Sequence, residues 1–157
     1  MQDQVLDITA ALVRTAGLIS DIRAGAAAEQ ELSAQQATVL CILAERTLPM
    51  AHVGALMRIN KSSATWLIDR AEEAGLVHRT TDPHDRRCQI VELTEHGSGL
   101  GEKYRARVTE LVEELITDLD PQERDLLRTT LSRVVLANQA QLSNQSPITW
   151  PSTTSAA

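Results

Sequence analysis

The order of two short helices and two β-prone runs in the middle of the chain limits the possible folds more than any other feature. The segment Met50–Met57 has helical periodicity. Asn60 is a typical N-cap for a second helix, which we expect to continue to Ala74 and to stop at Gly75. Only a short connection separates the two, so the sequence predicts a tight helix-turn-helix.

After this pair of helices the periodicity becomes that of extended chain. Leu76–Thr80 and Cys88–Leu93 favour β-strands, and Thr81–Arg87 between them carries turn residues. We therefore expect a β-hairpin with a long tip. Helix, tight turn, helix and hairpin is the order of a winged helix-turn-helix, in which the second helix lies in the DNA major groove and the hairpin reaches the neighbouring groove or the backbone.

Long helices are predicted on both sides of this central unit. Asp3–Ala28 has apolar residues at mostly three- and four-residue intervals, which is typical of an amphipathic helix. Ser33 opens a capping box for a helix over Ala34–Glu45. Thr94 caps a long helix, and Asp120, followed by proline, begins the last one.

The predicted fold class is mainly α with a small β-hairpin. We divide the chain into an N-terminal dimerisation helix (1–30), a winged helix-turn-helix DNA-binding region (31–97), C-terminal dimerisation helices (98–143) and a disordered tail (144–157). The terminal helices carry more apolar surface than the central unit can cover, and pairing with a second copy buries such surfaces on both partners. The alternative is a monomer that folds its termini back over the centre.

The composition agrees with one globular domain built from helices. Apolar residues make up 43% and aromatic residues 2% of the 157 residues, so Leu, Val, Ile and Ala must form the core. No apolar run approaches the roughly 18 residues of a membrane span, and no secretion signal precedes the first helix, so we expect a cytoplasmic protein with no membrane partner. The net charge of −6 argues against a polyanionic partner, but Arg58–Val91 is nearly neutral, with six Lys/Arg against five Asp/Glu.

The second helix of the pair has two distinct faces. Residues advance by about 100° along a helix, which predicts a buried side made of Ala64, Leu67, Ile68, Ala71 and Gly75. The opposite side carries Ser62, Thr65, Trp66, Asp69 and Glu73. In its first two turns these side chains include short hydroxyls that can bond phosphates or base edges.

Two motifs in the wing region are more specific. The tip Asp82–Arg87 reads DPHDRR, and the strand-to-helix junction Leu93–Gly97 reads LTEHG. With Gly75-Leu76-Val77 before the wing, these motifs make the stretch Val53–Gly97 resemble the DNA-binding core of the MarR family of bacterial transcriptional regulators. Beyond that third of the chain, the order of the helices agrees with the family.

The resemblance implies a homodimer shaped like a triangle that binds a pseudo-palindromic double-stranded DNA operator. It implies a repressor that releases DNA when a small molecule or an oxidant arrives. The family's usual effector site lies between the dimer helices and the DNA-binding lobe and often receives aromatic acids. Arg14 or Arg23 could neutralise such a carboxylate, but the sequence does not identify a contact.

This chain departs from the family pattern at three positions. Arg58 stands where the turn often has glycine, and Ala71 replaces a frequent leucine on the buried side of the second helix. Trp66 stands where we expect arginine or another polar residue. The operator sequence therefore cannot be carried over from relatives.

The candidate DNA-binding residues lie on the second helix and at the wing tip. They are Lys61, Ser62, Ser63, Thr65, Trp66, Arg70, Asp85, Arg86 and Arg87. We expect Trp66 to contact thymine methyl groups in the major groove. We expect Arg87 to enter a narrow minor groove, with its guanidinium oriented by the Asp85 carboxylate.

Two other functions are compatible with the same sequence pattern. A winged helix can also be a protein-interaction module without a DNA target. A thiol-based redox switch is a further alternative, because Arg86 and Arg87 precede Cys88 and nearby cations lower a thiol pKa, whereas Cys41 lies in an apolar run. The sequence has no phosphate-binding or nucleophile motif and no paired metal-ligand spacing, so we expect no enzyme, no cofactor and no metal site.

Overall fold

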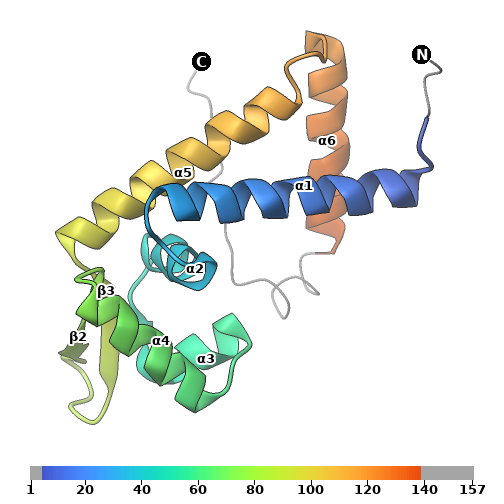
Figure 1. The fold of residues 1–157 in the computed structure, drawn as a ribbon. Coiled ribbons are helices and arrows are strands. Elements are labelled where there is room, and N and C mark those ends of the chain that lie inside the picture. The colour runs from blue at the N-terminus through green and yellow to red at the C-terminus, as the bar shows by residue number, and fades with distance from the viewer. Residues whose placement is uncertain (1–4, 139–157) are drawn as a thin grey trace.

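The computed structural model describes residues 5–138, which form helices and a small antiparallel sheet at one end of the molecule (Figure 1). The helices are α1 (Ile8–Glu29), α2 (Ala34–Leu43), α3 (Met50–Met57), α4 (Lys61–Glu73), α5 (Glu95–Leu115) and α6 (Pro121–Ala137). The strands are β1 (Leu48–Pro49), β2 (Val77–Thr81) and β3 (Gln89–Leu93). The predicted class, mainly α with a winged helix-turn-helix between long terminal helices, is confirmed.

Side-chain caps set most helix starts where the sequence predicts them. Ser33 and Asp120 each form a capping box, and Thr94 accepts a hydrogen bond from the backbone N–H of Gly97. The start predicted for α1 is wrong, because Asp7 is its N-cap and accepts the N–H groups of Thr9 and Ala10, so the helix begins at Ile8. α2 also ends two residues early, at Leu43.

The sheet has one strand more than the predicted hairpin. Its order is β1-β3-β2, with all pairs antiparallel, so β3 is the central strand. Val77 pairs with Leu93 at the base of the hairpin, and Leu48 of the short β1 pairs with Val91. A two-residue strand has no periodicity that a sequence could reveal.

The hydrophobic core lies where α2 meets α4, α5 and the sheet. Its largest fully buried side chains are Tyr104, Leu40, Ile68, Leu76, Val77 and Val91. We call α2, α3, α4 and the three strands the central lobe. Its apolar side chains are buried by its own elements together with α1 and α5.

A close contact joins the wing to α5. The Thr94 hydroxyl donates to the carbonyl oxygen of Gly75 at 2.6 Å, and the Thr94 N–H donates to that of Leu76 at 3.1 Å. A Cβ placed on Gly97 would lie 1.9 Å from the Leu76 carbonyl oxygen, so only glycine fits there. The LTEHG motif therefore holds the base of the wing against the N-terminus of α5.

The terminal helices α1 and α6 leave large apolar side chains uncovered. Ile8 is 74% and Leu126 68% exposed, and α6 buries none of its residues. Figure 1 shows α6 beyond the far end of α5, away from the central lobe. Within residues 5–138 the chain thus does not fold α6 back over its centre, contrary to the monomer alternative. Residues 139–143 of the predicted C-terminal dimerisation helices and the predicted tail 144–157 lie outside the described residues. No helix within residues 5–138 is long and apolar enough to cross a membrane.

Candidate nucleic-acid interface

A tight turn sets the position of α4 relative to α3. Arg58 ends α3 in the left-handed conformation, with φ of 54°, at the position where the family often has glycine. Asn60 then caps α4 by accepting the backbone N–H of Ser63 at 2.8 Å. The predicted helix-turn-helix is confirmed, including its cap.

The two faces of α4 follow the predicted pattern with one exception. Ala64, Leu67, Ile68 and Ala71 are buried. Gly75 lies beyond the helix in an exposed turn with φ of 69°, so its assignment to the buried side is wrong. Of the candidate contact residues on α4, Lys61, Ser62, Thr65, Trp66 and Arg70 are exposed and Ser63 is half-buried.

The short hydroxyls on α4 already have partners within the protein. Ser62 donates to the Asn60 side chain at 2.7 Å, and Thr65 donates to the backbone oxygen of Lys61 at 3.0 Å. Because a hydroxyl oxygen has two acceptor sites as well as its donor, both can still accept hydrogen bonds from outside the chain. This part of the surface is therefore an array of acceptors beside the Lys61 ammonium group.

Trp66 is a large aromatic side chain with little cover. It is 58% exposed, and the guanidinium carbon of Arg70 lies 5.7 Å from its ring centroid. Arg70 also forms an ion pair with Glu73 at 2.9 Å. The i, i+4 spacing of Trp66 and Arg70 is the sequence signal that could have revealed this contact. The stack holds the indole on the outward face of α4.

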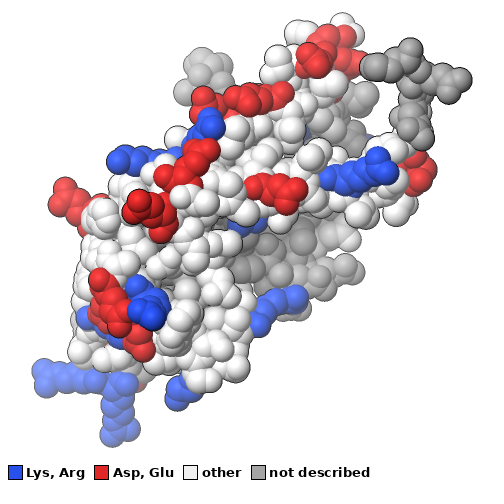
Figure 2. All heavy atoms as spheres, in the orientation of Figure 1, with Lys and Arg blue, Asp and Glu red and all other residues white. Residues whose placement is uncertain are grey.

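The wing tip is exposed from Pro83 to Cys88. Figure 2 shows basic side chains projecting at the lower left, where Figure 1 draws the β2–β3 connection, while acidic and basic side chains are mixed along α5. Arg86 and Arg87 are the basic residues of that connection. The structure thus places positive charge at the tip of an otherwise acidic protein.

The predicted contact between the side chains of Asp85 and Arg87 is absent from the described wing. Asp85 instead accepts the backbone N–H of Arg87 at 2.9 Å and the thiol of Cys88 at 3.3 Å. The first bond, and then the second, lower the pKa of Asp85. Asp85 therefore shapes the turn that carries Arg87 and does not orient its guanidinium.

The pKa of the Cys88 thiol is shifted in the direction opposite to that expected for a redox switch. This thiol donates to the Asp85 carboxylate, and this bond together with the negative charge raises the pKa of Cys88. The neighbouring arginines do not reverse the effect. Burial raises the pKa of Cys41, against the opposing charges of Arg105 and Arg23. The reason given for a reactive Cys88 thiolate is therefore wrong.

An open groove of about 690 Å³ lies between α3, the start of α4 and the wing. Lys61, Arg86 and Arg87 line it together with apolar residues such as Met50 and Ile59. The structure thus brings basic residues of α4 and of the wing to one concave surface. Among residues 5–138, no three His, Cys, Asp or Glu side chains are grouped so that they could hold a metal ion.

Comparisons with known sequences find similarity to the MarR family, the family suggested by the wing motifs. The sequence model of the MarR family matches residues 30–87. The HTH-type transcriptional regulator PecS of Dickeya dadantii is 33% identical over 109 residues, which are 66% of this chain and 65% of PecS. This chain covers a similar share, just under two thirds, of the other curated relatives that it matches.

Solved structures show the same fold over a larger part of the chain. The apo form of wild-type MarR from E. coli superposes with a TM-score of 0.72 at 21% identity, covering 85% of this chain and 99% of MarR. CouR from Rhodococcus jostii RHA1, in a structure with bound p-coumaroyl-CoA, has a TM-score of 0.64 at 29% identity and covers 85% of this chain and 95% of CouR.

Proposed function

Because this chain belongs to the MarR family, we propose that it is a sequence-specific DNA-binding transcriptional regulator. The observation that carries the proposal is the exposed face of α4, where Thr65 and Trp66 lie opposite a buried face and Lys61 is exposed at its flank. In winged-helix proteins such a helix enters the major groove. The basic wing tip then reaches the adjacent groove, where Arg87 meets the strong negative potential of a narrow minor groove.

The regulator acts as a homodimer on a pseudo-palindromic operator. The uncovered apolar side chains of α1 and α6 support this assembly, because a two-fold interface buries the same surface on both copies. A dimer presents two α4 helices, which read two half-sites about one helical turn of DNA, or a multiple of it, apart.

The regulator is a repressor that responds to a small aromatic acid bound between α1, α5 and the central lobe. CouR, which this chain resembles in fold, is bound to an aromatic acyl thioester. In this chain the Arg23 guanidinium on α1 donates to the hydroxyl of the buried Tyr104 on α5 at 3.4 Å, so a cation faces the junction of these helices. A ligand there shifts the spacing of the two α4 helices if it binds one arrangement more tightly than the other.

The test measures binding of the whole protein to a DNA fragment from the region upstream of its own gene. Fluorescence anisotropy gives the Kd at several salt concentrations. We expect log Kd to change linearly with log salt as phosphates are neutralised, and a scrambled duplex of equal length to bind much more weakly. p-Coumarate or p-coumaroyl-CoA should then weaken the operator complex.

Absence of salt-dependent DNA binding would favour the alternative, a winged helix that recognises another protein. A reporter gene placed behind the same fragment distinguishes a repressor from an activator, since a repressor lowers its expression.

A further inference from the structure

Arg79 on β2 connects the wing to α4 through two carboxylates. Its guanidinium bonds Asp69 Oδ1 at 2.5 Å and Glu72 Oε2 at 2.7 Å. The Arg79 side chain is only 19% exposed, whereas those of Asp69 and Glu72 are 49% and 38% exposed. Neither Arg79 nor Glu72 is among the site residues predicted from the sequence.

The backbone of Arg79 takes part in the same contact. Its N–H donates to Glu72 Oε1 at 3.1 Å, so both oxygens of Glu72 are used. β2 pairs with β3 along one side, and its other side is the edge of the sheet. Glu72 therefore replaces a missing strand partner at this edge, and three hydrogen bonds fix β2 against α4.

The contact needs the shape of arginine as well as its charge. Asp69 and Glu72 are three residues apart on α4 and thus point to the same side of the helix. A planar guanidinium can donate to both carboxylates at once, whereas a lysine ammonium is a point charge on a flexible stem.

The position of this contact matters for DNA recognition. Asp69 lies one turn after Trp66 and Thr65 on α4, and β2 runs from Arg79 through Thr81 towards the wing tip that carries Arg87. The contact therefore joins the helix that carries Trp66 to the strand that leads to the wing tip. It also neutralises carboxylates that would otherwise repel DNA phosphates.

We propose that Arg79 is a positioning residue for DNA recognition, which holds the wing at a fixed distance from α4 through Asp69 and Glu72. Asp69 then serves the internal contact and does not contact bases. The inference rests on the proposed function, because it assumes that α4 and the wing bind one DNA site together.

The first test is the variant Arg79→Lys, which keeps the charge and loses the double bridge. We expect operator affinity to fall about tenfold, the size of one lost specific contact. Affinity for a scrambled duplex and the salt slope should remain as in the wild type, because the number of charges is unchanged.

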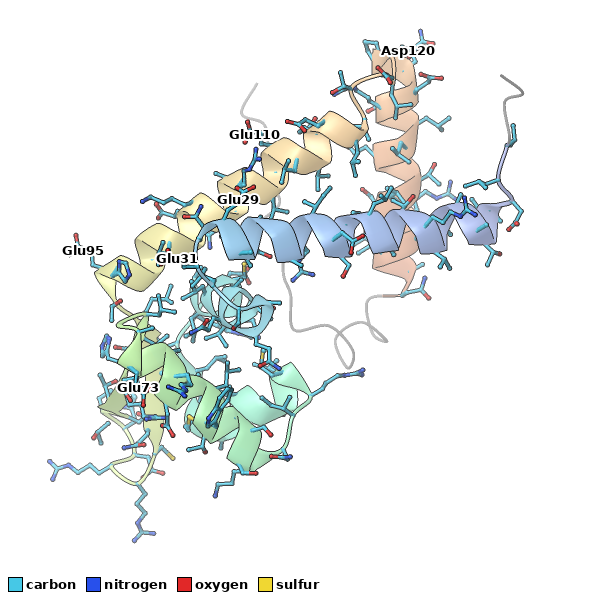
Figure 3. The ribbon with its side chains drawn as sticks, in the orientation of Figure 1. Glu29, Glu31, Glu73, Glu95, Glu110 and Asp120 are labelled. Atoms are coloured by element: carbon cyan, nitrogen blue, oxygen red, sulfur yellow. The ribbon has the colours of Figure 1, made fainter. Side chains whose placement is uncertain are left out.

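The matched control is Arg107→Lys on α5. The native Arg107 guanidinium also bridges two carboxylates, those of Glu29 and Glu110, but it lies away from the wing. Figure 3 labels both glutamates on the long helices, distant from Glu73 on α4. This control should bind the operator as tightly as the wild type does.

The second test is Asp69→Asn, which removes a negative charge from the DNA-facing side and one of the bridges. We expect opposite effects on the two kinds of DNA, with stronger binding to the scrambled duplex and weaker binding to the operator. A purely repulsive Asp69 would instead give stronger binding to both DNAs.

The outcomes separate the inference from the proposed function. Unchanged operator binding by Arg79→Lys overturns the inference while the proposed function stands. Equal losses on both DNAs, with a lower melting temperature at the same protein concentration, mean a structural role only and also overturn it. A wild-type protein without salt-dependent DNA binding overturns both.

Discussion

The central lobe and the terminal helices differ in how their apolar side chains are covered. In the lobe, α4 buries Ala64, Leu67, Ile68 and Ala71, whereas α6 buries none of its residues. Exposed apolar patches larger than a few hundred Å² are rare on monomers and usually mark interfaces. The lobe thus buries its apolar side chains within one chain, whereas those of α1 and α6 are left for the second copy of the proposed dimer.

Removing residues 120–157 tests this division most severely. Without Leu126, Leu131 and the rest of α6, we expect the protein to lose both dimerisation and operator binding, because the second α4 is no longer held in place. Light scattering should give about twice 17.2 kDa for the whole chain and a monomer for the truncated one. A chain lacking only residues 146–157 is the control and should dimerise. A truncated monomer that still binds the operator would contradict the proposal.

Gly97→Ala tests the junction between the two regions. The added Cβ would meet the Leu76 carbonyl oxygen, so we expect a loss of about 1–3 kcal/mol in the free energy of unfolding, as for other overpacked sites. Gly99→Ala is the control, since no atom lies within 4 Å of its Cβ position, and it should be neutral or stabilising. Urea unfolding at one protein concentration measures both. Equal stability of the two variants would show that the wing can move away from α5.

Trp66→Ala tests the reading face of the lobe. If the indole contacts thymine methyl groups, operator affinity should fall by roughly one to two powers of ten, while binding to a scrambled duplex, which depends on phosphates, remains. The folded state should keep its stability, because the ring is 58% exposed. Trp150 is the second tryptophan of the sequence, so a Trp150→Ala background leaves the fluorescence of Trp66 alone. This fluorescence should change when the operator is added. An emission spectrum that does not change when the operator is added would mean that the ring does not contact DNA.

Arg87→Ala tests the wing tip. We expect operator binding to weaken about tenfold with little change in melting temperature, because the side chain is exposed and its backbone N–H still bonds Asp85. Lys103→Ala on α5 removes the same charge from an exposed position outside the lobe. Equal affinities for the two variants would place Arg87 outside the DNA contact.

Asp85→Asn has the smallest expected effect, which is measured as a change in the alkylation of Cys88. Asp85 raises the pKa of the thiol, so its neutralisation should move the pH profile of Cys88 alkylation to lower pH. A Cys41→Ala background isolates the signal, and Asp82→Asn should shift it less, because the charge of Asp82 is the smallest cause. An unchanged profile would remove Asp85 as the cause. Equimolar peroxide should leave operator affinity as it is.

Much of the fold could be predicted because its signals are local. The caps at Ser33, Asn60, Thr94 and Asp120 each depend on groups within three residues, and the structure contains all four. The buried face of α4 follows from helical geometry alone. The start of α1 was missed because the apolar spacing that predicted the helix does not mark its first residue, which the Asp7 cap sets.

The contacts within the candidate site were harder to predict. Asp85 and Arg87 have the spacing of an ion pair, but the carboxylate bonds a backbone N–H and the Cys88 thiol instead. A turn gives an aspartate several nearby donors, and only the backbone conformation selects among them. The pKa of Cys88 therefore changes in the direction opposite to that expected from the preceding arginines.

By itself the sequence determined the order of the helices and the hairpin, the caps of α2, α4, α5 and α6, and the outward position of Trp66, because each depends on neighbours along one helix or hairpin. Only the tertiary structure decided that β1 joins the sheet, that α6 is left uncovered, and that Arg79 bonds Asp69 and Glu72. These features join segments that no periodicity relates, so they arise when the chain packs its core and brings α4 against the edge of β2.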